Sequence, residues 1–547
     1  MAMERREFLK TIAGMGSLAA LGSISQLPFL KQAQAAAPAF SDYKAMVCIF
    51  LYGGNDAFNM LVPLGSDPGK GYTNYADIRN DLAVQNRDLD LATVTTNQGN
   101  LNQGILGSGS ANPYNQNLNQ ASAYTRGHYP LTAKGIDLGV NGVMPELAQL
   151  IHNNRVSILA NTGTLVKPVT RSEIKAGNVA LPKFLFAHNH QQRELQTGRA
   201  DSLGDIGWAG RIADNWSNIN DSNPLGLNVS YFGNNRMMIG RSTSPLVIKT
   251  GAPPNIAHLK EGIGNSSDDR RVLFKALAGI QGSTSRLNFD ATNTVDTSDP
   301  YRRLYNRLLL KSLSTFDQLN DSWKASQINF STTGPYGEAL FDIPTHQQLG
   351  FSDSINGQLI EQLAAVAQMI HLGATGALGP GYNRQIFLVQ LGGFDTHSSQ
   401  AATHPLLLRE LSLGLWKFQK AMEELGYAKQ VTTFTLSDFG RTLSRNGDGT
   451  DHAWGSHQLV MGGLGDGSAA SLDGGKLFGT LPDLHLDGDD DYNDKGRIIP
   501  TMAQDQVNAA IVRWFGVDDS LMQSLFPNLV HFQTNGNFDS AYVDLFA

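Results

Sequence analysis

Three acidic residues of this sequence each follow a short apolar segment and lie beside glycine. They are Asp56, Asp395 and Asp438, in the segments GGND, GGFD and SDFG. A single aspartate in such a place commonly begins a turn or caps a helix. Three in the same setting favour a shared site, because carboxylates that follow separate strands can converge on one point.

Histidines accumulate around the later carboxylates. His397 lies two residues after Asp395, and the glycine-rich segment GTDHAWGSH contains a further aspartate and two histidines. Carboxylate and imidazole ligands without thiolate suit Zn²⁺, Mn²⁺ or Mg²⁺, and Ca²⁺ where carboxylates dominate. We therefore expect a divalent metal site. Its candidate ligands are Asp56, Asp395, His397, Asp438, Asp451, His452 and His457.

A parallel β-sheet is the element that would position these residues. Continuously apolar strands are expected at 45–51, 156–159, 385–391 and 430–436, and helices at 144–153, 357–372 and 406–425. Strand, helix and strand over 385–436 form a βαβ unit, which requires parallel strands. The sequence therefore predicts an α/β fold with a doubly wound, mainly parallel sheet flanked by helices. Ligands of such sheets bind at the carboxyl ends of the strands.

The N-terminus is typical of a twin-arginine export signal. RREFLK is followed by a mildly apolar run and then by AQA, which offers the small residues that a signal peptidase needs. Glycines and a proline interrupt the apolar run, which argues against a membrane anchor. Residues 1–35 are therefore expected to be a cleaved signal read by the twin-arginine machinery. The mature protein would act in the periplasm or outside the cell.

Composition limits the remaining possibilities. The chain has 547 residues, a net charge of −7 and no basic block, which excludes nucleic acid as an expected partner. The single cysteine, Cys48, cannot form an intrachain disulfide. Residues 36–547 contain no stretch that would span a membrane, and we expect them to form one domain. Within it, residues 80–135 are rich in Asn, Gln, Gly and Ser and predict a polar surface insertion.

Three blocks of the sequence resemble a known family. FLYGGNDAFNMLVP, LGGFDTHSSQ and TLSDFGRTLSRNGDGTDHAWGSHQLVMGG are similar to the signature blocks of a bacterial twin-arginine-exported family, a domain of unknown function (number fifteen-oh-one). That family looks like a remote branch of the alkaline phosphatase and sulfatase superfamily. The resemblance implies an alkaline-phosphatase-like fold in which divalent ions clamp a phosphate or sulfate. It implies metal ligands at Asp56, Asp395, His397, Asp438 and His452.

The nucleophile is where the sequence departs from that superfamily. Its members attack with a Ser, Thr or modified Cys at a helix N-terminus. The matching position here is Ala187, which cannot attack. Thr162 and Thr164 are candidate substitutes, whereas His188 and His190 are candidates for a ligand or an acid.

Two functions remain open at this stage. The first is an exported metal-dependent hydrolase of phosphate or sulfate esters, whose substrate is a small anionic ester. Arg441 would neutralise the charge of that anion, although it could equally form an ion pair within the protein. The alternative is a non-catalytic secreted or surface protein that keeps the fold to bind a metal, an anion or a partner. Ala187 and the polar insertion favour the alternative.

Overall fold

The computed structural model describes most of the chain after the predicted signal. The described residues are 40–89, 124–216, 225–251, 319–379, 382–465 and 471–546, with the backbone of the strands at 280–281 and 294–295. The export signal expected at 1–35 lies outside the described residues. So does the middle of the expected insertion, residues 90–123.

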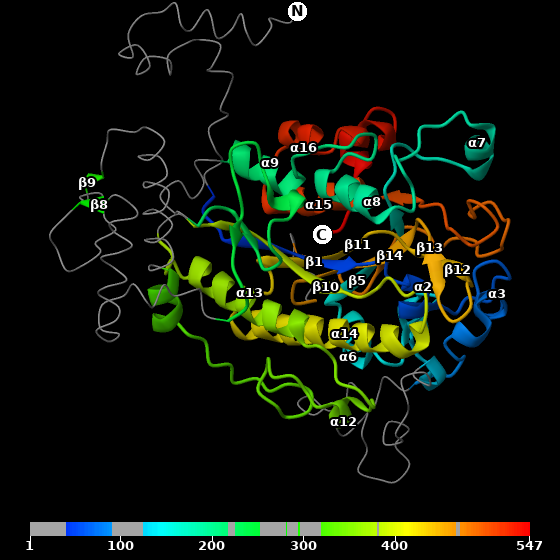
Figure 1. Cartoon of the computed structure of the whole chain (residues 1–547), viewed down its shortest axis with the longest axis horizontal. Coiled ribbons are helices and arrows are strands. Elements are labelled where there is room, and N and C mark those ends of the chain that lie inside the picture. The colour runs from blue at the N-terminus through cyan, green and yellow to red at the C-terminus, as the bar shows by residue number, and fades with distance from the viewer. Residues whose placement is uncertain are drawn as a thin grey trace, which may run out of the picture.

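A nine-stranded sheet runs through the molecule (Figure 1). Its order is β15-β5-β14-β11-β1-β10-β6-β7, and β16 pairs with β5. The strands are β1 (Lys44–Tyr52), β5 (Val156–Gly163), β6 (Asn228–Ser230), β7 (Leu246–Val247), β10 (Arg384–Gly392), β11 (Val431–Ser437), β14 (Ser456–Gly462), β15 (Leu477–Phe478) and β16 (Met502–Ala503). Only β14 is antiparallel to its neighbours in this sheet. The structure confirms an α/β fold with a mostly parallel sheet.

The three central strands end at one edge of the sheet. Leu51 near the end of β1 pairs with Leu391 of β10 on one side and with Ser437 of β11 on the other. Every residue of β1 from 45 to 51 is buried, as the continuously apolar sequence predicts for a strand covered on both faces. The segments that follow these strands therefore emerge side by side.

Helices cover both faces of the sheet (Figure 1). One layer contains α6 (Pro145–His152), α13 (Gln358–Ala374) and α14 (Gln400–Glu424), and the other contains α8 (His188–Thr197), α9 (Trp208–Asn215), α15 (Gln504–Phe515) and α16 (Asp519–Leu525). The helices expected at 144–153, 357–372 and 406–425 are confirmed, and α14 begins earlier than the sequence suggested.

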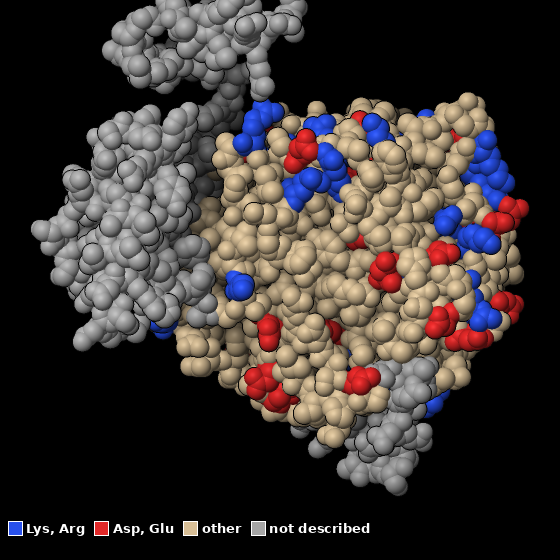
Figure 2. Space-filling model, viewed as in Figure 1, with Lys and Arg blue, Asp and Glu red and all other residues tan. Residues whose placement is uncertain are grey.

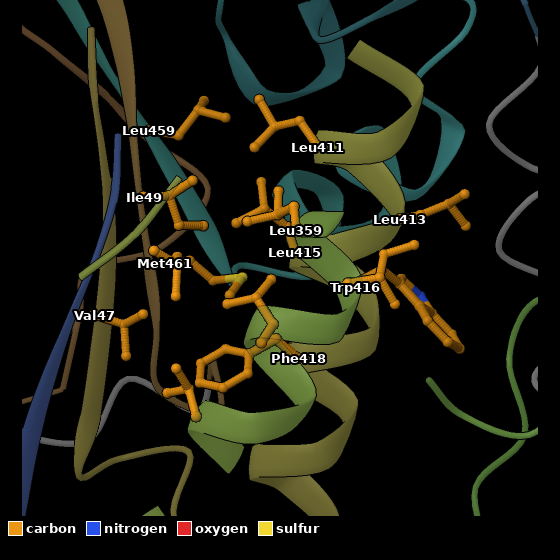
Figure 3. Close-up of a cluster of buried hydrophobic side chains, with 14 of the residues drawn as sticks. Val47, Ile49, Leu359, Leu411, Leu413, Leu415, Trp416, Phe418, Leu459 and Met461 are labelled. Carbon is orange, nitrogen blue, oxygen red and sulfur yellow. The ribbon is translucent and has the colours of Figure 1, made fainter. Parts of the chain in front are cut away.

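Apolar side chains fill the space between the sheet and α14. In Figure 3, Leu411, Leu415 and Phe418 of α14 point toward the strands that carry Ile49 and Met461. All of these side chains are at most 1 % exposed. Burying one such side chain contributes about 1.5–3 kcal/mol, so this layer holds α14 firmly on the sheet.

Smaller elements complete the described fold. A hairpin of β12 (Arg441–Arg445) and β13 (Thr450–His452) follows β11 directly. The other elements are α2 (Ala57–Met60), β2 (Leu61–Pro63), α3 (Tyr72–Arg79), η2 (Asn80–Leu82), β3 (His128–Pro130), η4 (Thr132–Lys134), β4 (Leu138–Asn141), α7 (Arg171–Ala176), η5 (Arg236–Met238), β8 (Ile280–Gln281), β9 (Thr294–Val295), α12 (His346–Leu349), η7 (Pro527–Phe532) and η8 (Phe538–Ala541).

The flanks of the expected polar insertion pack into the protein. Leu82 and Val84 before it and Tyr124 after it are buried together in one apolar cluster. The main chain of Gln85 donates a hydrogen bond to the carbonyl of Tyr124, which joins the two flanks. Within the expected range of 80–135, these described ends therefore belong to the folded body.

One face of the molecule carries few charges. On the face shown in Figure 2, lysines, arginines and acidic residues are sparse, and most of the described surface there is neutral. Among the described residues, no helix combines the length and the apolar character that crossing a membrane requires.

Two carboxyl groups are buried, one on α8 and one on α15. Glu194 on α8 is 1 % exposed and Asp505 at the start of α15 is 7 % exposed. Burial raises the pKa of Glu194 to about 9 and the pKa of Asp505 to about 7. The negative charge of Asp505 also contributes to the raised pKa of Glu194. The folded protein therefore holds a proton on Glu194 at neutral pH.

This burial predicts a pH-dependent stability. The unfolded chain releases the Glu194 proton above a pKa of about 4.3, whereas the folded chain keeps it. The contribution is complete below the unfolded pKa and is lost as the pH rises toward 9. We expect the free energy of unfolding in urea to fall between pH 5 and pH 9, by up to about 1.4 kcal/mol per pH unit for this proton. Glu194→Gln should flatten that decline. The exposed Glu361→Gln is the matched control, and equal slopes for Glu194→Gln and wild type would contradict the prediction.

Candidate metal centre

The carboxyl edge of the sheet gathers acidic residues and histidines from distant parts of the chain. Asp395 follows β10 and Asp438 follows β11, while His452 ends β13. His188 is the first residue of α8, which lies over the same edge. Because the strands are aligned, their terminal side chains meet in one place, as expected for a parallel sheet.

Three imidazole nitrogens surround one oxygen of Asp395. Asp395 Oδ1 lies 3.4 Å from His188 Nε2, 3.1 Å from His397 Nε2 and 3.1 Å from His452 Nε2. His452 Nε2 is 2.8 Å from His397 Nε2 and 3.1 Å from His188 Nε2. Ligands that bind Zn²⁺ tetrahedrally at about 2.0–2.1 Å lie about 3.3 Å from one another. His188, Asp395 and His452 therefore have the chemistry and nearly the spacing of a single-ion site, and His397 Nε2 lies beside the last two.

The other ring nitrogen of two of these histidines faces a carboxylate. His188 Nδ1 lies 2.6 Å from Asp438 Oδ2, and His397 Nδ1 lies 3.3 Å from Asp451 Oδ1. An ionised carboxylate only accepts, so His188 Nδ1 carries the proton in its hydrogen bond to Asp438 and the lone pair of the ring is on Nε2. The Asp451 carboxylate faces His397 Nδ1 and favours the same tautomer there. Histidines that bind metals are commonly held by this carboxylate contact.

A backbone carbonyl orients the third histidine. His452 Nδ1 donates to the carbonyl oxygen of Phe186 at 2.8 Å, so its Nε2 also presents a lone pair. Phe184 and Phe186 have φ values of 55° and 69°, in the left-handed region that bulky residues rarely adopt. Such a conformation costs of order 1 kcal/mol or more per residue and is found mainly at functional sites. The strained turn positions the Phe186 carbonyl against His452.

The pKa values of the residues in the group shift in different directions. The hydrogen bond to Asp438 is the largest cause of a raised pKa at His188, whereas burial lowers the pKa of His452. Burial also acts to raise the pKa of Asp395, but the hydrogen bond and charge of Arg441 outweigh it and the pKa is lowered. Asp395 is therefore an anion at neutral pH and can attract a cation.

Arg441 is bound entirely inside the protein. It is 1 % exposed and donates to Asp395 Oδ1 at 2.8 Å, to the carbonyl of Gly53 at 3.3 Å and to Thr450. The structure places this predicted anion-binding residue behind Asp395, where it orients the carboxylate. A substrate in solvent cannot reach a side chain so deeply buried.

Asp56 lies behind the group rather than in it. Its two oxygens accept bonds of 2.5 and 2.7 Å from Arg79, and Gln400 Nε2 donates to Oδ2 at 2.5 Å. Asp56 and Arg79 are both 0 % exposed. Gln400 Oε1 accepts from Thr396 and Thr450, which links this buried ion pair to the loops that carry the histidines. Asp56 therefore braces the edge of the sheet.

Thr162 and His457 are not brought to the histidine group. Thr162 is 2 % exposed and its hydroxyl donates to the carbonyl of Ser456 at 3.4 Å. His457 is fully buried, accepts from the amide of Asn161 through Nδ1 and has a pKa lowered to about 4 by burial. Both residues pack in the sheet beside the site.

The predicted nucleophile position is the N-cap of α8. Ala187 occupies it, directly before His188, and supplies no capping side chain. His190, one turn into the helix, stacks on Phe184 with ring centroids 4.2 Å apart. Among the described residues it does not join His188, Asp395 and His452 in their cluster, and its ring lies against the strained turn.

Several contacts of the group were not predicted from sequence. Gln192 Nε2 donates to Asp438 Oδ2 at 2.7 Å, and the ring of Phe439 lies 4.7 Å from His188 and 4.6 Å from His452 between centroids. Gln192 follows His188 by four residues, a spacing that places both on one helix face. That spacing could have predicted that Gln192 lies beside His188. The contact of the Phe186 carbonyl involves the backbone, so the residue types do not predict it.

Comparison with known proteins supports the resemblance of the later blocks. Residues 366–487 match the model of a family described as "Protein of unknown function (DUF1501)". The matched segment contains Asp395, His397, Asp438 and His452, whereas His188 lies outside it. A comparison with curated proteins finds no match.

Removal of any one imidazole tests the group directly. We expect His188→Ala, His397→Ala and His452→Ala each to weaken Zn²⁺ binding by at least about 100-fold, because each removes one of only a few ligands. Elemental analysis and competition with a chromogenic chelator measure the change. The exposed His152→Ala is the control and should bind as wild type does. Unchanged binding in all three variants would show that the metal, if bound, lies elsewhere.

The carboxylates that hold Nδ1 should have a smaller effect. Asp438→Asn and Asp451→Asn keep the shape of the side chain but lose its charge, and should weaken metal binding by about 10- to 100-fold without abolishing it. Asp483→Asn is a matched control, because the Asp483 carboxylate pairs with the exposed His485 at 2.7 Å and with none of the three histidines near Asp395. Complete loss of metal in Asp438→Asn would instead favour Asp438 as a direct ligand.

Proposed function

We propose that this protein is an exported, metal-dependent hydrolase of phosphate or sulfate esters. The observation that carries the proposal is the convergence of His188, His397 and His452 on Asp395, with each Nε2 free to bind an ion. The side chains of Asp395 and His397 are 46 % and 43 % exposed. Structural metal sites are closed, so a site open to solvent favours catalysis over a purely structural role.

The residues present fit a resident divalent ion. Neutral imidazoles and an ionised carboxylate are ligands for Zn²⁺ or Mn²⁺, and the same set accommodates Mg²⁺ less well. An ion held by these four residues would supply Lewis acidity toward an ester oxygen and would lower the pKa of an attached water. Asp438, Asp451 and the Phe186 carbonyl keep the three rings in place, and Arg441 keeps Asp395 charged and oriented.

The architecture supports placement near the alkaline phosphatase and sulfatase superfamily. A sheet with helices on both faces and acidic residues after three neighbouring parallel strands is the arrangement that a doubly wound, alkaline-phosphatase-like fold requires. The DUF1501 match covers the later half of that arrangement. Similar folds host many chemistries, so the proposed reaction rests on the histidine group and not on the fold.

Water is the proposed attacking group. Ala187 has no nucleophilic atom, and among the described residues no serine or threonine hydroxyl makes a hydrogen bond to His188, Asp395, His397 or His452. Thr162 is buried against Ser456. Direct hydrolysis by water therefore suits this site better than a covalent intermediate on the protein.

Export by the twin-arginine route is part of the proposal. His188, the Asp395–His397 segment and His452 come from three distant parts of the sequence and meet only after folding. The twin-arginine machinery transports folded proteins, so a protein could acquire its metal before export. We propose that the mature chain acts in the periplasm or outside the cell.

Two observations favour a non-catalytic alternative. Ala187 stands where the superfamily carries its nucleophile, and Arg441 is buried instead of facing a substrate. A protein that kept the metal group but lost turnover would show both features. It would bind a metal or an anion in the same place without hydrolysing an ester.

Turnover with and without metal separates the two functions. We expect the metal-loaded mature chain to hydrolyse 4-nitrophenyl phosphate or 4-nitrophenyl sulfate, and to lose at least about 100-fold in kcat/KM after chelation or in Asp395→Asn. The His152→Ala variant is the control and should keep the activity of the wild type. Bound metal without hydrolysis of either ester would support the non-catalytic alternative. Absence of any bound metal would contradict both functions.

A further inference from the structure

One arginine beside the metal group has unused hydrogen-bond donors. Arg497 Nε donates to the backbone carbonyl of His452 at 2.8 Å, and its guanidinium carbon lies 4.6 Å from the centre of the Phe186 ring. His452 and Phe186 are themselves joined by the bond that orients the His452 ring. Arg497 is therefore fixed against two components of the site.

The remaining nitrogens of Arg497 are available. Within the described part of the chain, neither Nη1 nor Nη2 makes a hydrogen bond or ion pair, and the side chain is only partly buried. Arg441, by contrast, has its donors taken up by Asp395, Gly53 and Thr450. Of these two arginines, only Arg497 combines contact with the site and free donors.

We propose that Arg497 binds the oxyanion of the substrate. A guanidinium presents two parallel N–H donors that match two oxygens of a phosphate or sulfate, and its charge persists at all relevant pH values. Stacking on Phe186 and the bond to His452 limit its motion before an anion arrives, which lowers the entropic cost of binding. Arg497 thus selects esters with a charged tetrahedral group. The inference rests on the proposed function, because the anion is taken to lie beside the metal group.

Phe186 gives the inference a structural basis. The same residue presents its carbonyl to His452 and its ring to Arg497, and Tyr492 packs edge-on against that ring at 5.3 Å between centroids. The strained backbone at Phe186 therefore positions a metal-binding ring and an anion-binding guanidinium together. Oxyanion recognition and metal binding would then be set by one loop.

Anion titration of the metal-loaded chain tests the proposal. Inorganic phosphate and, separately, inorganic sulfate are titrated into wild type, Arg497→Ala and Arg497→Lys by calorimetry, after metal content and melting temperature have been measured. We expect Arg497→Ala to bind at least about tenfold more weakly at unchanged metal content, as the loss of a charge-assisted hydrogen bond implies. Arg497→Lys should recover part of the affinity. Comparison of the two anions shows whether phosphate or sulfate is preferred.

A second arginine variant serves as the control for Arg497→Ala. Arg513→Ala removes an arginine that is paired with Asp519 and Asp539, and it should bind anions as wild type does. Wild-type affinity in Arg497→Ala, or no binding of either anion to wild type, would overturn the role of Arg497. Absence of metal would instead contradict the proposed function. In that case the same titration of the metal-free chain still tests Arg497, because it measures anion binding without turnover. Arg497→Gln replaces Arg497→Ala if the alanine variant melts at a lower temperature.

Discussion

Three imidazoles can face one carboxylate oxygen only if each ring is held by its other nitrogen. In this protein the second nitrogens of His188, His397 and His452 face Asp438, Asp451 and the Phe186 carbonyl respectively. Without those acceptors the rings could rotate or exchange tautomers, and the lone pairs would no longer converge. The convergence of the three rings on Asp395 therefore depends on this outer set of contacts.

The sheet supplies the positions from which these contacts are made. Parallel pairing of β1 with β10 and β11 brings the segments after the three strands to one edge. The buried pair of Asp56 and Arg79 then fixes that edge from below. Removing one member of a buried pair leaves an uncompensated charge and commonly costs about 3–5 kcal/mol, so the pair constrains the edge even though it binds no ligand.

Much of the fold follows from the sequence, and so does part of the site. Strands β1, β10 and β11 are continuously apolar, which identifies buried parallel strands without a structure. Asp395, His397 and His452 were predicted ligands, and the structure brings them together. The antiparallel direction of β14 could not be predicted, because direction depends on pairing and not on composition.

The remaining assignments depend on side-chain direction. Asp438 and Asp451 have the residue type and position of ligands, yet their oxygens face Nδ1 atoms. Asp56 is taken by Arg79, which lies 23 residues away in a separate helix. Sequence spacing places a residue at an edge of the sheet but does not say which neighbour its side chain will contact. For the same reason, the sequence motif predicted Arg441 as the anion-binding residue and did not predict Arg497.

X-ray absorption spectroscopy of the Zn²⁺-loaded mature chain tests the central claim most directly. The structure predicts one ion with three imidazole nitrogens and a carboxylate oxygen at about 2.0–2.1 Å, seen as strong multiple scattering from the rings. In the His188→Ala variant, the multiple scattering should fit fewer imidazole ligands than in the wild type. A first shell made mainly of carboxylate oxygens, with at most one imidazole, would contradict the account, because the histidines would then not be the ligands.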